Sequence, residues 1–194
     1  MKKNLPKPKQ CCWPIKDGDT LMQEYHDIEW GVPLFDDQKI FEFLVLESAQ
    51  AGLSWQVVLR KRENYRKAFA GFDPRRVAKF DAKKIAKLLQ NSGIIRNRAK
   101  IAAAINNARV FLKVQKEFGT FSKYIWEFVG NKPIRNRWKT IKDLPAKTEI
   151  AEKLSDDLKA RGFKFLGPTV IYAHMQATGM VNDHLVGCSR WRGV

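Results

Sequence analysis

The sequence has few cysteines and no long apolar run. Its 194 residues include three cysteines, and an odd, low count does not build a disulfide framework. No stretch approaches the roughly 18 consecutive apolar residues of a membrane-spanning helix. The basic start, residues 1–9, is not followed by the apolar segment of a secretory signal. These absences exclude a disulfide-stapled secreted scaffold, and we expect a protein of the reducing cytoplasm.

Acidic residues are scarce relative to basic ones. The chain has 20 Asp+Glu against 36 Lys+Arg, which gives a formal net charge of +16. A surplus of this size favours a polyanionic partner over an ordinary charged surface. Hydrophobic residues make up 44% of the chain and aromatic residues 11%, which is enough for a core and excludes wholesale disorder. We therefore expect a folded protein that binds nucleic acid.

The period-two alternation of amphipathic strands is nearly absent, which predicts an all-α fold. N-cap residues and apolar residues at helical spacing mark the expected helices. We expect a flexible basic tail over residues 1–9, a single domain over residues 10–194, and an irregular connection over 130–147. Helices are predicted over residues 40–46, 55–69, 82–93, 98–118, 121–129, 149–161 and 168–177, with another starting at Asp73-Pro74.

Potential metal ligands gather in two short windows near the ends of the chain. One cysteine and one histidine from each window would make the Cys₂His₂ set of a structural zinc site. Buried free cysteines and hydrogen-bonded histidines explain the same pattern equally well. Asp183 is adjacent to one of these histidines and is a candidate to orient its ring. The first window holds Cys11, Cys12 and His26, and the second holds His184 and Cys188.

Glu47 follows an apolar run, residues 43–46. Burying a carboxylate among apolar side chains is unfavourable unless it is paired or functional. Periodicity alone, however, favours a position for Glu47 on the polar face of its helix. The nearby Gly52-Leu53 would place an apolar tip on a loop, where a leucine either packs inward or acts as a wedge in a base stack. The aromatic residues close to these positions are either core residues or base-stacking residues; they are Trp13, Tyr25, Trp30 and Trp55.

A glycine-containing turn around Gly93 joins two predicted helices. Such a turn can expose backbone N–H groups that hold a phosphate. Arg96, Arg98 and Lys100 add positive charge there. A plain connection between helices has the same pattern.

Taken together, these segments resemble the DNA-3-methyladenine glycosylase I family. The resemblance extends over residues 10–188 and rests on several motifs in the right order. The matching stretches are Cys11-x-Trp13 and residues 25–33, 51–55, 61–65, 93–96, 161–165 and 181–184.

The resemblance implies a helix-hairpin-helix fold and a zinc ion that joins the two ends of the chain. The hairpin would grip the DNA backbone through Gly93, Ile94, Arg96 and Arg98. The zinc ligands would be Cys11, His26, His184 and Cys188. Cys12 could compete with Cys11, although the Cys-x-Trp spacing favours Cys11.

The resemblance also implies a base pocket, with Glu47 as the carboxylate that contacts the lesion. Tyr25 and Trp55 would stack on the base, with Trp13 nearby. Gly52 and Leu53 would fill the space left by a flipped nucleotide. Met22 stands where the family has a further aromatic residue, so stacking on that side would change.

The activity implied is hydrolytic release of 3-methyladenine from alkylated double-stranded DNA, without lyase chemistry, by a monomer associated with the bacterial nucleoid. Met22 keeps an alternative open, in which the chain is a non-enzymatic, zinc-stabilised protein that binds damaged DNA on the same fold. No lysine is identifiably buried in the sequence, which argues against a Schiff-base step.

Overall fold

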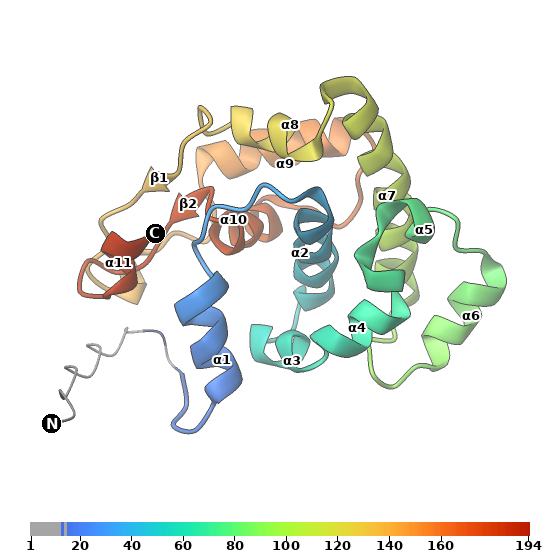
Figure 1. Ribbon diagram of the computed structural model, residues 1–194, viewed down its shortest axis with the longest axis horizontal. Coiled ribbons are helices and arrows are strands. Elements are labelled where there is room, and N and C mark those ends of the chain that lie inside the picture. The colour runs from blue at the N-terminus through green and yellow to red at the C-terminus, as the bar shows by residue number, and fades with distance from the viewer. Residues whose placement is uncertain (1–12, 14) are drawn as a thin grey trace, which may run out of the picture.

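The computed structural model describes residue 13 and residues 15–194, so the predicted tail, Cys11 and Cys12 lie outside the described residues. The described chain is mostly helical (Figure 1), as predicted. None of its helices is long and apolar enough to cross a membrane. The elements are α1 (Thr20–Glu24), η1 (Tyr25–Glu29), α2 (Asp37–Gln50), α3 (Trp55–Arg60), α4 (Arg62–Ala68), η2 (Ala70–Phe72), α5 (Pro74–Val77), α6 (Ala82–Gln90), α7 (Arg98–Phe118), α8 (Phe121–Glu127), β1 (Ile134–Arg135), η3 (Ile141–Asp143), α9 (Glu149–Ala160), α10 (Pro168–Ala177), β2 (Val181–Asn182) and α11 (Arg190–Gly193).

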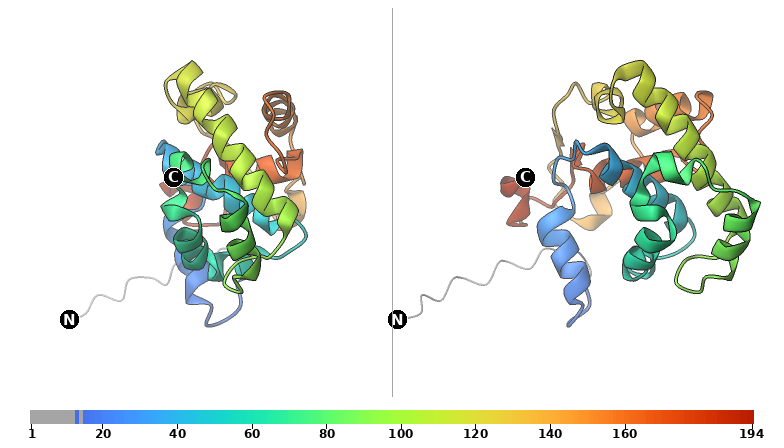
Figure 2. Two further views of the ribbon diagram at one scale, coloured as in Figure 1. Left: turned by 90° about the vertical axis from the view of Figure 1, so that its right-hand side faces the viewer. Right: turned by 45° about the vertical axis from the view of Figure 1, so that its right-hand side comes forward.

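Helix α2 lies at the centre of the molecule, in contact with α3, α7, α8 and α10 (Figure 1). Residues 40–49 of this helix are all buried. A helix that is covered on every side belongs to the interior of a domain. The long helix α7 also contacts α5 and α6, and Figure 2 shows it running diagonally across the molecule. Because α2 is central, its C-terminal half is held in place by neighbours on several sides.

Side-chain caps mark most of the predicted helix starts. Asp36 accepts a hydrogen bond from the Lys39 N–H at 2.8 Å, and Asp81 accepts one from the Lys84 N–H at 2.7 Å. Such caps satisfy N–H groups that have no partner within the helix. Helix α7 has the predicted bounds. The single helix predicted over residues 55–69 is wrong, since the helix is interrupted at Lys61 and the segment divides into α3 and α4.

A small parallel sheet was not predicted. Strand β1 lies in the segment expected to be irregular and pairs with β2, with Ile134 opposite Val181 and Arg135 opposite Asn182. Two-residue strands are too short to show alternation. The pairing ties the connection after α8 to the C-terminal segment.

The segment after α10 returns to the start of the described chain. The Gly31 N–H donates to the Gln176 carbonyl at 3.0 Å, and the Leu34 N–H donates to the Thr178 carbonyl at 3.0 Å. Gly179 has a φ of +68°, and a Cβ at this position would clash with the backbone of Val32. Glycine is therefore required where the two ends of the fold cross.

His174 of α10 gives the fold a predictable acid sensitivity. The ring is buried, and neither nitrogen has a hydrogen-bond partner among the described residues. Burial lowers the pKa of His174 from 6.5 to about 3. Below pH ~6.5 the unfolded chain therefore binds a proton at His174, whereas the folded chain does not. The contribution of His174 to the free energy of unfolding is thus complete above pH ~6.5 and is lost as the pH falls toward 3. We expect this group to remove about 2 kcal/mol of unfolding free energy between pH 6.5 and 4.5.

Urea unfolding of the wild type and of His174→Leu at both pH values measures this effect. The variant should lose less stability than the wild type over the interval. Equal losses in the two proteins would assign the acid sensitivity to other groups.

Candidate functional site

A pocket of about 250 Å³ lies where α1, η1, α10 and the C-terminal half of α2 meet. It is smaller than the roughly 300–1,000 Å³ of sites for drug-sized ligands, so it suits one small planar molecule. The structure brings together in this pocket Glu47 and all four residues expected to contact a base. The lining residues are Trp13, Ile15, Met22, Tyr25, Trp30, Glu47, Gln50, Trp55, Ala173 and Gln176.

Aromatic rings form much of the pocket wall. The ring centroids of Trp13 and Tyr25 are 6.1 Å apart at an interplanar angle of 27°, and those of Tyr25 and Trp55 are 5.3 Å apart at 45°. Trp30 supports this wall, with its centroid 4.7 Å from that of Trp13. Electron-rich ring faces attract cations and stack on nucleobases. The wall therefore suits a planar, positively charged ligand.

Among the described residues that line this pocket, Glu47 is the one with a carboxyl group. The residue is only 4% exposed, so the prediction that Glu47 lies on the polar face of its helix is wrong. Burial raises the pKa of Glu47 to about 8. No side-chain hydrogen bond or ion pair to Glu47 occurs within the described part of the chain. A buried carboxyl group without such compensation, facing a pocket, is typical of a functional site.

The loop after α2 carries the apolar tip that the sequence predicts. Residues 51–54 are exposed, Gly52 has a φ of +80°, and Leu53 is 41% exposed. The ammonium group of Lys100, in the first turn of α7, donates to the carbonyls of Ala49 and Ala51 at 2.9 and 2.6 Å. Lys100 was expected to add charge to the neighbouring turn. Instead, it ties that turn to the loop that carries Leu53.

The predicted turn at Gly93 is the connection between α6 and α7. The Asn91 side chain accepts a hydrogen bond from the Gly93 N–H at 2.9 Å. A Cβ at Gly93 would lie 3.0 Å from the Cβ of Asn64, so the turn packs closely on α4. The side chain of Ile94 is buried in the core, so a DNA contact through this residue would involve its backbone.

Two cations project from this turn. Arg96 and Arg98 are exposed, and neither forms an ion pair with any described residue. The backbone beneath them is held in place, because the Ile95 N–H donates to the Tyr65 hydroxyl at 3.0 Å. The turn is therefore a fixed platform with two free guanidinium groups, which suits a phosphate backbone.

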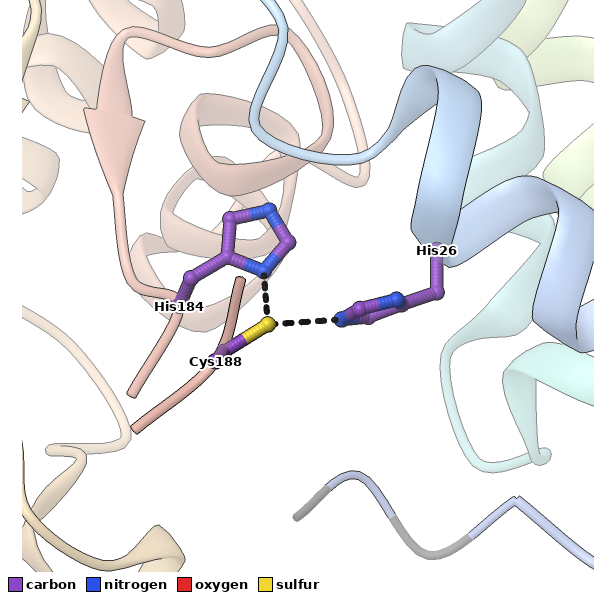
Figure 3. A group of neighbouring side chains, drawn as sticks. All are labelled: His26, His184 and Cys188. Atoms are coloured by element: carbon purple, nitrogen blue, oxygen red, sulfur yellow. Dashed lines mark hydrogen bonds between the residues drawn. The ribbon is translucent and has the colours of Figure 1, made fainter. Parts of the chain in front are cut away.

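Three of the four predicted metal ligands meet in the structure (Figure 3). The Cys188 Sγ lies 3.8 Å from the His26 Nε2 and 3.7 Å from the His184 Nδ1. All three side chains are buried, and their ligand atoms lie within 4.8 Å of one another. Two imidazole nitrogens and a thiol that converge on one point fit the donor set of zinc. Cys11, the fourth predicted ligand, lies outside the described residues.

The second ring nitrogen of each histidine contacts a group outside the cluster of His26, His184 and Cys188. The His26 Nδ1 lies 2.7 Å from the Asp27 Oδ1, and the His184 Nε2 lies 3.1 Å from the Trp30 carbonyl oxygen. Such outer contacts fix the orientation of metal-binding histidines. The expectation that Asp183 orients a ligand is wrong, because its carboxylate is bonded to four other side chains.

A short π-helix joins the pocket to the histidine–cysteine cluster. Tyr25 and His26 are consecutive residues of η1. Tyr25 lines the pocket and His26 faces Cys188. A shift of η1 would therefore move both sites together.

The chain matches known proteins over nearly its whole length. The family model of methyladenine glycosylase matches residues 13–191. A DNA-3-methyladenine glycosylase from Haemophilus influenzae is 52% identical, over 92% of this chain and 96% of its own. A crystal structure of 3-methyladenine DNA glycosylase I has a TM-score of 0.90 at 46% identity and covers 93% of this chain and 98% of its own. A second structure is a variant of 3-methyladenine DNA glycosylase I in complex with 3-methyladenine. It has a TM-score of 0.88 at 38% identity, and the match covers 92% of this chain and 95% of that protein.

Proposed function

This chain belongs to the methyladenine glycosylase family and is an enzyme of the DNA glycosylase class, and we propose that it releases 3-methyladenine from alkylated duplex DNA by hydrolysis. The observation that carries this proposal is the pocket, where a buried carboxyl group meets electron-rich rings. A related protein binds 3-methyladenine itself. Membership of an enzyme family sets aside the non-enzymatic alternative.

The chemistry of the lesion explains why so few groups are needed. Methylation at N3 makes adenine a cation and a good leaving group, so the enzyme mainly has to extrude the nucleotide and bind the base. The faces of Tyr25 and Trp55 attract the positive ring. A cation beside Glu47 favours ionisation of that carboxyl group, and the carboxylate then accepts hydrogen bonds from the base.

Bond cleavage transfers the electron pair of the glycosidic bond to the base, which leaves as neutral 3-methyladenine. Water then attacks the anomeric carbon of the sugar and loses a proton to solvent. The pocket lining within the described residues includes no lysine that could act as an amine nucleophile. This favours simple hydrolysis without a lyase step.

The DNA would be held at two places. Arg96, Arg98 and the backbone around Gly93 contact phosphates, in the manner of a helix-hairpin-helix. Gly52 and Leu53 enter the space that the flipped nucleotide leaves in the stack. Because Lys100 links these two segments, backbone binding places the Leu53 tip at the duplex.

Met22 replaces one aromatic side chain that the family resemblance implies. It is half-buried, lines the pocket and packs against the apolar cluster that includes Tyr25 and Trp30. A thioether packs favourably on a ring edge. Met22 thus completes the pocket wall through dispersion contacts, at a position where the family resemblance implies an aromatic ring that stacks on the base.

We also propose that His26, His184 and Cys188 hold a structural zinc ion, with Cys11 as the fourth ligand. The observation behind this proposal is the convergence of the three donors. When bound, the ion would cross-link η1 to the segment after β2. The three donors are not among the residues that line the Glu47 pocket, so the proposed role of the ion is structural.

The decisive experiment is an assay of free bases released from methylated duplex DNA. We expect 3-methyladenine to be released well above its spontaneous rate. Release at the spontaneous rate only, by folded protein, would contradict the proposed activity.

Arg96→Ala should weaken binding to duplexes of any sequence. Loss of one phosphate contact is expected to lower the slope of log affinity against log salt by about one. Fluorescence anisotropy with a labelled duplex at several salt concentrations measures the slope. Lys142→Ala, at an exposed lysine of η3, is the control and should leave the slope unchanged. An unchanged slope in Arg96→Ala would count against the hairpin assignment.

A further inference from the structure

We propose that Gln176, held in one orientation by Asp183, is a specificity-determining residue whose side-chain carbonyl selects an adenine-type base over a guanine-type base. This inference rests on the proposed function and deepens it.

Asp183 is a buried carboxylate surrounded by neutral donors. Its Oδ1 accepts hydrogen bonds from the Asn136 Nδ2 and the Trp138 Nε1, both at 2.7 Å. Its Oδ2 accepts them from the Tyr172 hydroxyl at 2.5 Å and the Gln176 Nε2 at 2.8 Å. The side chain is only 2% exposed. A carboxylate only accepts hydrogen bonds, so the amide nitrogen of Gln176 has to face it.

The rest of α10 holds Gln176 against the pocket. Its backbone carbonyl accepts the Gly31 N–H at 3.0 Å, and Gln176 lines the same pocket as Glu47. Because the amide nitrogen is bonded to Asp183, the carbonyl oxygen Oε1 is the polar atom left for a ligand. No described residue donates a hydrogen bond to this oxygen. The pocket therefore presents a fixed acceptor at this position.

A fixed acceptor distinguishes the two purines. Adenine carries an amino donor at C6, where guanine carries a carbonyl acceptor. The Gln176 carbonyl would bond the amino group of 3-methyladenine and repel the O6 of 3-methylguanine.

Glu47 adds a second acceptor once the cationic base has favoured its ionisation. Its carboxylate and the Gln176 carbonyl then only accept hydrogen bonds. Removal of the Gln176 acceptor should therefore weaken the preference for 3-methyladenine and leave part of it in place.

The test measures the release of both bases from one methylated duplex in one reaction. Gln176→Met keeps the shape of the side chain and removes the acceptor. We expect the ratio of 3-methyladenine to 3-methylguanine release to fall about fivefold, the equivalent of one neutral hydrogen bond. General loosening of the fold would lower both rates without changing their ratio. An unchanged ratio, with 3-methyladenine release retained, would overturn the proposal.

Two further variants separate orientation from packing. In Asp183→Asn the partner can donate, so the Gln176 amide can turn and present N–H groups to the pocket, and we expect the ratio to fall as well. Asn136→Ala removes another donor to Asp183 without touching Gln176 and should keep the wild-type ratio. A change in Asn136→Ala as large as that in Gln176→Met would also overturn the proposal.

If the wild type releases neither base, the proposed function fails, and the role of Gln176 is decided by affinity. Quenching of tryptophan fluorescence would then give the affinities for free 3-methyladenine and free 3-methylguanine. The preference for 3-methyladenine should fall about fivefold in Gln176→Met. An unchanged preference would contradict the inference.

Discussion

Replacing Glu47 with glutamine should lower the rate of 3-methyladenine release by at least about 100-fold, the usual cost of removing one preorganised electrostatic group. Glutamine keeps the shape of the side chain but cannot become an anion beside the cationic base. Affinity for duplex DNA should stay close to that of the wild type, because the proposed phosphate contacts lie on the α6–α7 turn. Single-turnover release and anisotropy measure the two properties separately.

Glu42→Gln is a matched control on the same helix. Glu42 is also buried, but it accepts from Arg62 at 2.6 Å and from Arg66 at 2.8 Å and does not line the Glu47 pocket. Its replacement should lower the melting temperature and leave the rate of release near wild type in the folded protein. Wild-type release by Glu47→Gln would make Glu47 a structural residue only.

Cys188→Ala should remove the metal and destabilise the fold. We expect the zinc content to fall from about one ion per chain to near zero. The melting temperature should fall by about 10 °C or more, since the loss of several kcal/mol shifts a protein of this size by that amount. The physical reason is that the ion would join residues 26 and 184–188, which are distant in the sequence. Metal analysis and thermal unfolding followed by circular dichroism measure the two effects.

Substitutions in the N-terminal segment provide the controls. Cys11→Ser should resemble Cys188→Ala, whereas Cys12→Ser should retain the metal. A strong chelator should lower the melting temperature of the wild type and leave that of Cys188→Ala unchanged. Wild-type protein that binds no zinc, with a melting temperature insensitive to the chelator, would remove the zinc proposal.

The helices that carry their own boundary signals could be predicted from the sequence. Asp36, Asp73, Asp81 and Thr148 each accept a hydrogen bond from the first turn of a predicted helix. The division between α3 and α4 could not be predicted, because Lys61 is neither glycine nor proline and nothing local marks a break. The small sheet depends on two distant segments and has no local signal either.

The candidate site was only partly predictable. The ligand windows at the two ends of the chain could be found because cysteine and histidine are rare in this sequence. The burial of Glu47 could not be found from periodicity, because α2 is covered on all sides. The partners of Lys100 and Asp183 depend on tertiary packing, so both residues were expected to act elsewhere.

The two hydrogen bonds of Lys100 also bear on which insertions this enzyme can tolerate. Residues 51–54 form an exposed loop, and loops of that kind usually accept extra residues at little cost in stability. Here Lys100 holds the carbonyls of Ala49 and Ala51, so an added residue would either break these hydrogen bonds or move Leu53 relative to α7. If Leu53 contacts DNA as proposed, the length of this loop is limited by that contact as well as by folding, and we expect length variation in surface segments that Lys100 does not anchor.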